Sequence, residues 1–331
     1  MTSSLQETAY WLYLAFGDGR PTRREVNALV LTAHRREGLG LLDLIRRDPD
    51  DLPPALAPHA PALRALQAAE SKVSAQAFVA AELERRNIAL LPITDDAYPA
   101  HLARRLTPAA APTVLLVAGD LTPLRSPGVA ISGSRAAGAS GLAFARACGR
   151  ALAERAIAVV SGLARGVDNE GLEGALEAGG SVLGVSAEGL LVSRWTLGHN
   201  AATNLTVISE FPPRQPWRAG TAMARNRTIA GMSRAIIIAD CVAPGGTTNQ
   251  VEVHRKLGLR VLVRRGHGEG PMVAKLAAEP GVEPLPWDAG TVNLPALPEE
   301  GLESATTGAR PQELQQDTPP LGAQQLLFAG G

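Results

Sequence analysis

The chain of 331 residues is poor in cysteine, lysine and aromatic residues, and it has no long apolar run. Its two cysteines, Cys148 and Cys241, stand too far apart for a CxxC motif and exclude a disulfide scaffold. No stretch of 18 apolar residues is present, and the N-terminus lacks the basic and apolar segments of a secretory signal. These absences predict a cytoplasmic protein with no membrane association, whose 45% hydrophobic residues suffice to bury a core.

Charge is balanced over the whole chain but not along it. The formal net charge is zero, yet residues 1–210 carry −1, residues 211–266 carry +8 and residues 267–331 carry −7. Only three of the 32 basic residues are lysines, so arginine supplies nearly all of the positive charge. A concentrated positive charge is typical of a protein with a polyanionic partner, although a merely solvated basic face has the same sequence signature.

Hydrophobic patterning divides the chain into three parts. Residues 1–88 repeat apolar residues at helical spacing and predict a small all-helical domain. Residues 89–287 alternate short apolar β-rich runs with longer helical ones, which predicts a Rossmann-like, doubly wound α/β domain with a mostly parallel sheet. Residues 288–321 are rich in Pro, Glu, Gln, Gly and Thr and predict a disordered linker. The strands are expected at 113–117, 129–132, 157–161, 181–185, 206–209, 235–239 and 260–263, and the helices of this domain at 140–155, 169–178, 224–232, 248–257 and 271–278.

The last ten residues, 322–331, regain apolar character and hold a candidate peptide motif. Gln324, Leu327 and Phe328 lie in the run QQLLF, which resembles the peptide that binds the bacterial sliding clamp. Gln324 would anchor such a peptide, and Leu327 and Phe328 would fill an apolar groove of the clamp. The alternative is an apolar end without a partner, or a short helix that packs on the domain.

Four loops are expected at the carboxyl ends of the predicted strands, where open α/β sheets bind ligands. The first contains Gly133, Ser134 and Arg135 ahead of a helix, and glycine backbone, a helix N-terminus and a guanidinium together favour phosphate binding. Its spacing is neither GxGxxG nor GxxxxGK[ST], which argues against a standard dinucleotide site and a P-loop. The alternative is a tight turn that needs small residues.

The second loop runs from Ser161 to Asp168 and contains Gly162 and Arg165. Arg165 is expected to point into the presumed crevice, whereas Asp168 is interpreted as the N-cap of the following helix. The fourth loop contributes hydroxyl and backbone N–H groups that would complete an anion site, from Gly245, Gly246 and Thr247.

The third loop combines aromatic and cationic residues: Phe211, Trp217, Arg225, Asn226 and Arg227. Arg225 and Arg227, two residues apart at a helix start, predict a forked cationic surface that suits a phosphodiester backbone. Phe211 and Trp217 are candidates for stacking on bases, which would give sequence-tolerant binding of a single strand. Ordinary packing in the core is the alternative for both rings.

Signals for catalysis are weak. The six histidines are scattered, and the chain has no HExxH, no GxSxG and no Cys/His cluster with metal-ligand spacing. The sequence therefore predicts a binding protein with no catalytic residues, no metal and no cofactor. The alternative is a nucleotide-binding sensor or an enzyme, because the segment from Pro244 to Thr247 with Glu252 partly resembles the PGGxGTxxE loop of phosphoribohydrolases that act on nucleoside monophosphates. An assembly scaffold is a third interpretation.

Taken together, several motifs in this order and spacing resemble the DprA/Smf family of DNA-processing proteins, and the chain is identified as a divergent member without the C-terminal winged helix. The resemblance implies a small all-helical, SAM/HhH-like domain ahead of a Rossmann-like core. It further implies that this core binds single-stranded DNA, dimerises, protects incoming DNA during natural transformation and loads the RecA recombinase, without catalytic turnover. The motifs are Tyr98-Pro99, residues 133–135, 161–168, Ala175-Leu176, Ser209-Glu210 and residues 225–231. The candidate DNA contacts are Gly133, Ser134, Arg135, Ser161, Gly162, Arg165, Arg225, Asn226, Arg227, Gly245, Gly246 and Thr247.

Overall fold

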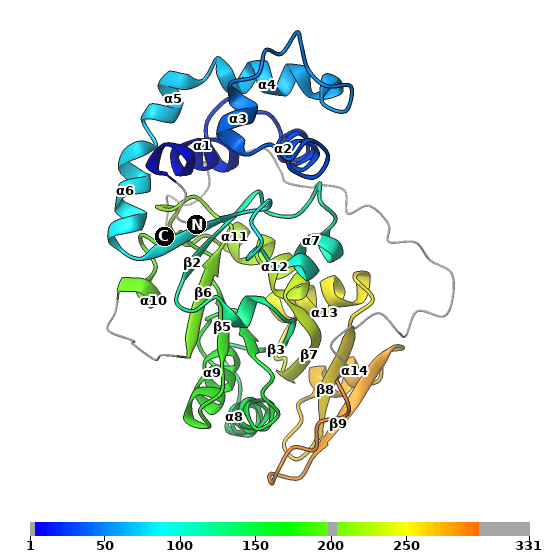
Figure 1. Ribbon diagram of the computed structural model, residues 1–331. Coiled ribbons are helices and arrows are strands. Elements are labelled where there is room, and N and C mark those ends of the chain that lie inside the picture. Colours follow the sequence, from blue (N-terminus) through cyan, green and yellow to red (C-terminus); the bar gives the residue numbers. More distant parts are fainter. Residues whose placement is uncertain (1–3, 198–203, 298–331) are drawn as a thin grey trace, which may run out of the picture.

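Nine strands form one sheet in the order β1-β2-β6-β5-β4-β3-β7-β8-β9, within residues 4–197 and 204–297, the parts of the chain that the computed structural model describes (Figure 1). Strands β3 to β9 are parallel, whereas β2 runs antiparallel to both of its neighbours, β1 and β6. The chain builds β4, β5 and β6 on one side of β3 and then crosses to β7 on the other. This arrangement confirms the predicted doubly wound, mostly parallel sheet. The strands are β1 (Ile88–Pro92), β2 (Val114–Ala118), β3 (Gly128–Gly133), β4 (Val159–Ser161), β5 (Val182–Val185), β6 (Leu205–Ser209), β7 (Ser233–Asp240), β8 (Arg260–Gly266) and β9 (Val282–Trp287).

Helices cover both faces of the sheet, so the middle of its central strands is apolar. In β7 every residue is buried: Ala235 and Ile237 face α8 and α9, whereas Ile236 and Ile238 face α7, α12, α13 and α14. A strand buried on both faces has a continuous apolar run instead of alternation, which is the pattern that the sequence shows. The helices of this part are α7 (Ala100–Leu106), α8 (Ala139–Ala153), α9 (Val167–Glu177), α10 (Arg194–Leu197), α11 (Ala219–Ala224), α12 (Asn226–Gly231), α13 (Gly246–Lys256) and α14 (Pro271–Ala277).

The expected elements of the sheet domain are present with small shifts of their ends, but both edge strands were missed. Strand β1 begins at Ile88, the last residue of the predicted helical domain. Strand β9 contains Pro284 and Pro286, which lack the N–H that a central strand must donate. Because prolines argue against a strand, the sequence pattern did not predict one here. An edge position tolerates them because one side of the strand has no partner.

The N-terminal helices form a layer at one end of the sheet, at the top of Figure 1. A buried asparagine of α2, Asn27, joins this layer to the segment before β2. Its Nδ2 donates to the carbonyl oxygens of Pro108 and Ala111 at 2.7 and 2.9 Å, and its Oδ1 accepts from Thr113 Oγ1 at 2.8 Å. Both N–H donors and the oxygen of its side-chain amide are thus hydrogen-bonded inside the protein. The helices are α1 (Leu5–Phe16), α2 (Arg23–Glu37), α3 (Leu41–Ile45), α4 (Ala60–Gln67), α5 (Glu70–Ser74) and α6 (Ala77–Arg85).

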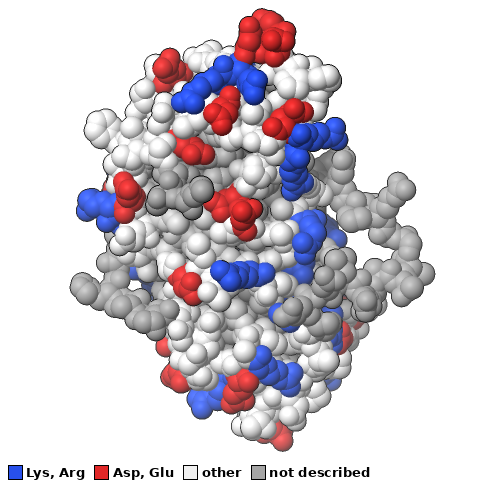
Figure 2. Space-filling view, viewed as in Figure 1, with Lys and Arg blue, Asp and Glu red and all other residues white. Residues whose placement is uncertain are grey.

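Much of the cationic segment 211–266 serves the fold. Arg264 is 1% exposed and donates to three backbone carbonyls, and Arg234 donates to Pro127 and Leu297. Arg260 pairs with Glu283. On the face shown in Figure 2, basic side chains lie in separate groups, several next to acidic ones. The concentration of arginine in this segment is therefore not by itself a continuous basic surface.

The described residues after β9, 288–297, include a segment that packs on the sheet. Val292 and Leu294 are buried against the same core as Trp287. Guanidinium donors hold four successive carbonyls, those of residues 294–297, and they come from Arg155, Arg234 and Arg260. The linker predicted from residue 288 thus begins with packed residues. These arginines lie near the amino ends of β7 and β8 and at the end of α8, the edge of the sheet opposite the strands' carboxyl ends.

No helix in the described ranges is long and apolar enough to cross a membrane.

Replacement of Asn27 by alanine should lower the free energy of unfolding by about 2–4 kcal/mol, because it leaves buried carbonyl and hydroxyl groups without partners. Chemical denaturation measures the change. Gln6→Ala, which removes an exposed amide from α1, serves as the control and should change stability by less than about 0.5 kcal/mol. An Asn27→Ala protein as stable as the control would contradict this account of how the helical layer is attached.

Candidate functional site

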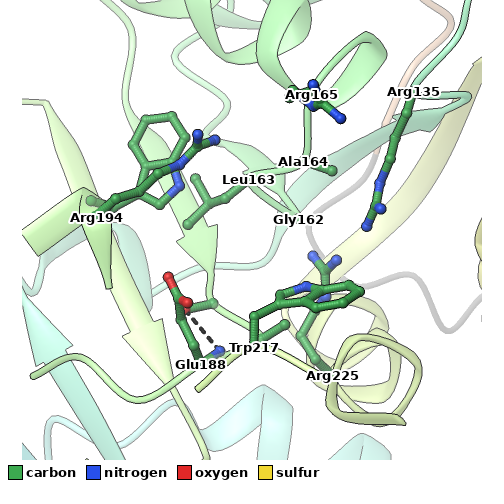
Figure 3. Close-up of a pocket in the computed structure, with 12 residues that line it drawn as sticks. Arg135, Gly162, Leu163, Ala164, Arg165, Glu188, Arg194, Trp217 and Arg225 are labelled. Carbon is green, nitrogen blue, oxygen red and sulfur yellow. Dashed lines mark hydrogen bonds between the residues drawn. The ribbon is translucent and has the colours of Figure 1, made fainter. Parts of the chain in front are cut away.

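A cavity of about 320 Å³ opens at the carboxyl ends of β3 to β6 (Figure 3). Its walls come from the loops that follow four parallel strands, because the carboxyl ends of parallel strands meet at the same edge of a sheet. The first three of the four loops expected at this edge contribute to it. The lining residues are Arg135, Gly162, Leu163, Ala164, Arg165, Ser186, Ala187, Glu188, Arg194, Trp195, Trp217 and Arg225.

Three exposed arginines and two tryptophans form the upper walls of the cavity. The Cζ of Arg135 lies 5.5 Å from the ring centroid of Trp217, and the Cζ of Arg194 lies 5.1 Å from that of Trp195. Figure 3 shows Arg135 and Arg194 on opposite sides, with Arg165 between them along the rim. Guanidinium groups stacked on rings keep their N–H donors available in the ring plane, so these walls can bind both anionic and planar groups.

Arg225 forms the floor and is 5% exposed. Its Nη1 donates to the carbonyl oxygen of Val185 at 3.3 Å, and its guanidinium faces the carboxylate of Asp168. Gly162 leaves the space for this arrangement: a Cβ there would lie 1.9 Å from Arg225 Nη1 and 2.6 Å from Asp168 Oδ2. Gly162 is thus required by a close approach inside the protein.

The interpretation of Asp168 as an N-cap is wrong. The N-cap of α9 is Gly166, at a φ of +79°, and Asp168 is the second residue of the helix. Its side chain is buried at 4% exposure, beside Arg225. Burial raises the pKa of Asp168 to about 6, against the opposing effects of Arg225 and of the backbone N–H groups of Ala164 and Gly162. A carboxylate here offsets part of the positive charge of Arg225 when it is ionised.

The turn after β4 is held in an unusual conformation. Leu163 has a φ of +59°, which places an apolar side chain in the left-handed region at the cavity wall. Ser161 supports this turn, because its Oγ accepts from the Leu163 N–H at 3.1 Å and donates to the Asp168 carbonyl at 3.2 Å. Ser161, expected to contact a ligand, therefore acts within the loop and does not line the cavity.

The N-terminus of α8, expected to bind phosphate, is occupied by the protein itself. Asp240 at the end of β7 accepts from the Gly138 N–H at 3.2 Å, and a Cβ on Gly141 would lie 2.8 Å from its Oδ2. A carboxylate in this position takes the place that a phosphate would have. Gly133 and Ser134 consequently contribute no anion site at the start of α8, and Arg135 is the residue of this loop that lines the cavity.

The predicted fork of Arg225 and Arg227 does not form one surface. Side chains of residues i and i+2 on a helix point roughly 200° apart. Arg225 accordingly lines the cavity, whereas Arg227 does not. Asn226 is buried, donates to Asn249 and accepts from Gln250, and so joins α12 to α13. Of the two candidate stacking residues, Trp217 lines the cavity, whereas Phe211 is partly buried outside its lining.

The fourth loop connects β7 to the start of α13. Strand β7 lies on the opposite side of β3 from β4, β5 and β6, so this loop lies away from the loops that form the cavity. Gly245, Gly246 and Thr247 do not line the cavity. Glu252, the acid of the alternative enzyme hypothesis, is exposed on α13 and pairs with Lys256 at 2.7 Å. Among the residues that the structure describes, no group of three His, Cys, Asp or Glu side chains is placed to hold a metal ion.

The segment after β5 supplies Glu188, Arg194 and Trp195 to the cavity, and none of these residues was predicted from the sequence. The signal that could have found it is positional: residues 186–195 directly follow the strand expected at 181–185 and so belong at the same sheet edge. Their composition has no glycine-rich or paired-arginine pattern, and for this reason they did not stand out.

Helix α6 of the N-terminal layer holds two walls of the cavity. Arg86, its C-cap, donates from Nη1 to the carbonyl oxygen of Leu191 at 3.0 Å. Glu82 pairs with Arg86 at 2.8 Å and also with Arg214. Leu191 precedes the Arg194 wall and Arg214 precedes Trp217, so the helical layer restrains both loops.

Comparison with known proteins gives one family. The family model described as DNA recombination-mediator protein A matches residues 89–275, more than half of the chain. Protein Smf of Escherichia coli is 30% identical over 233 residues, which cover 68% of this chain and 59% of the relative. DNA processing protein DprA of Streptococcus pneumoniae is 33% identical over 159 residues, which cover 47% and 55%. The chain thus matches between half and two thirds of the length of these relatives.

Solved structures show the same fold. DNA processing protein A of Streptococcus pneumoniae aligns with a TM-score of 0.62 at 24% identity, over 86% of this chain and 95% of that one. DNA processing protein A of Helicobacter pylori, whose structure describes its single-stranded DNA binding mode, aligns with a TM-score of 0.51 at 24% identity. That alignment covers 60% of this chain and 90% of the other.

Ionisation of Asp168 should make the protein less stable as the pH rises from about 4 to about 6. The folded state raises the pKa of Asp168 from 3.8 to about 6, so it binds the proton more tightly than the unfolded state over this range, and the free energy of unfolding falls as the proton leaves. Asp168→Asn should remove this component, whereas Asp96→Asn, an exposed control, should retain it. Denaturation at several pH values measures both; identical profiles for the two variants would contradict the prediction.

Proposed function

The chain belongs to the DNA recombination-mediator protein A family, and on this premise we propose that it binds single-stranded DNA in recombination and natural transformation. The observation that supports this most strongly is the cavity at the carboxyl edge of the sheet, where four arginines surround two tryptophans. Guanidinium groups bind phosphates with two parallel hydrogen bonds, and indole rings stack on bases of any sequence.

The three exposed arginines of the cavity are free to bind phosphates. Arg135, Arg165 and Arg194 form no ion pair with any carboxylate in residues 4–197 and 204–297. Arg214, which lies before Trp217 in the third loop, is by contrast paired with Glu82. The buried Arg225 adds a fourth guanidinium at the floor, where the Asp168 carboxylate offsets part of its charge.

The shape of the site favours a single strand over a duplex. A cavity of about 320 Å³ has room for a nucleotide that is turned out of the backbone, with its base against Trp217 or Trp195. A base in a duplex stays stacked and paired, and turning it out costs a few kcal/mol, whereas a single strand presents its bases without that cost.

Three finer expectations stay predictions: homodimerisation, transfer of the strand to RecA, and binding of the sliding clamp. The clamp motif, with Gln324, Leu327 and Phe328, lies outside the described residues. The described chain reaches residue 297 at the amino edge of the sheet, opposite the cavity.

Substitution of the exposed arginines tests the DNA site. The double variant Arg135→Ala/Arg165→Ala should bind a labelled oligo(dT) strand at least several-fold more weakly, and alike for all sequences. Because each phosphate contact in a single strand releases counterions, the slope of log affinity against log salt should flatten by roughly 0.7 per lost contact. Fluorescence anisotropy across salt concentrations measures both effects.

The matched control is Arg125→Ala. Arg125 is exposed and lies just before the amino end of β3, opposite the cavity, so its loss should leave affinity and salt slope near those of the wild type. Duplex DNA of the same length should bind more weakly than the single strand. Equal loss of affinity in both variants, or none in either, would count against the cavity as the DNA site.

The clamp hypothesis has a separate test. Phe328→Ala should reduce recovery of purified sliding clamp in a pull-down with the full chain, because the motif would lose the ring that fills the apolar groove. The same variant should bind oligo(dT) like the wild type, which shows that the protein is intact. Equal clamp recovery from both proteins disposes of the motif.

A further inference from the structure

Glu188 is an acidic residue in a cavity built to attract anions. It is partly buried and lines the wall formed by the residues after β5. Figure 3 shows its carboxylate between Arg194 and Trp217, across the cavity from Arg135 and Arg165. Although four arginines share this cavity, the carboxylate forms no ion pair within the described part of the chain, and the one interaction drawn for Glu188 uses its backbone N–H.

The main chain at Glu188 is fixed from several sides. Its N–H donates to Ser186 Oγ at 3.1 Å and its carbonyl oxygen accepts from Ser209 Oγ at 2.8 Å. The next residue, Gly189, donates to the Gln215 carbonyl at 2.8 Å, and a Cβ there would lie 2.1 Å from the Pro212 carbonyl oxygen. The carboxylate is therefore presented to the cavity from a rigid turn, as a group that reads a ligand should be.

A carboxylate placed here weakens the attraction for phosphate, so its presence needs a ligand group that donates to it. Ionised carboxylates only accept hydrogen bonds, and their two oxygens match two adjacent donors. Among the four DNA bases, guanine alone has two adjacent donors on its pairing edge, N1–H and the 2-amino group. Adenine, cytosine and thymine place an acceptor next to each donor on that edge, and this acceptor would repel the second carboxylate oxygen.

Resting on the proposed DNA-binding function, we propose that Glu188 makes the cavity selective for guanine in a single strand. Its two oxygens accept from N1–H and the 2-amino group, while Trp217 or Trp195 stacks on the ring. Arg194, on the same side of the cavity, donates to the adjacent O6 atom, which is the contact that arginine makes most often to guanine. The remaining arginines bind the flanking phosphates and have no base preference.

The test compares oligo(dT) strands that carry one central dG, deoxyinosine, dA, dC or dT, by fluorescence anisotropy with the full chain. The wild type should bind the dG strand about tenfold more tightly than the dA, dC and dT strands, as one bidentate contact gives. Deoxyinosine lacks the 2-amino group and should fall between. Glu188→Gln should bind all five strands within about twofold of one another, because an amide offers one acceptor and one donor in place of two acceptors.

Glu154→Gln is the control, since Glu154 is exposed at the end of α8, at the edge of the sheet opposite the cavity, and should keep the preference for dG. Equal affinity of the wild type for all five strands overturns the inference and leaves the proposed DNA binding intact. Glu188→Gln that tightens binding to every strand by one common factor also overturns it, because Glu188 would then only repel phosphate. No binding of any strand by the wild type overturns the proposed function itself.

Discussion

The cavity depends on one buried charge, the guanidinium of Arg225. A charged group without partners would be costly at 5% exposure, and here it is balanced by the Asp168 carboxylate and by backbone carbonyls, including that of Val185. These partners lie on the segments that follow β4 and end β5, so satisfying a single guanidinium fixes the relative positions of several loops. This arrangement requires glycine at position 162, because a side chain there would collide with both the guanidinium of Arg225 and the carboxylate of Asp168.

Arginine has two separate roles in this protein. Arg234, Arg260 and Arg264 use their several donors to fasten backbone carbonyls, which suits a planar group with five N–H donors. Arg135 and Arg165 instead lie exposed at the rim of the cavity without acidic partners. The charge count along the chain marked residues 211–266, but of the four arginines that line the cavity only Arg225 comes from that segment. The other three are Arg135, Arg165 and Arg194, so the site draws its arginines from loops up to 90 residues apart.

The helical layer takes part in the site although none of its residues line the cavity. Asn27 attaches the layer to the segment before β2, and α6 holds the loops that carry Arg194 and Trp217. Salt bridges at the surface contribute little to stability because water screens them, so the Glu82 contacts act mainly on the position of the loops. The sheet domain supplies the lining residues of the cavity, and the helical layer holds two of the loops that carry them.

The sequence by itself determined the class of fold and the edge at which the site lies, because continuous apolar strands alternating with helices permit few arrangements, and the carboxyl ends of parallel strands must meet. It also identified Arg135, Gly162, Arg165, Trp217 and Arg225, which follow strand ends or carry distinctive patterns. Only the tertiary structure decided which residues face the cavity. Arg227 does not line it, and Asp168 is buried beside Arg225. Asp240 accepts a hydrogen bond at the start of α8, and Glu188 lines the cavity from a loop that has no recognisable motif. The direction and burial of a side chain follow from packing between segments that are distant in sequence. The local sequence pattern therefore does not predict them.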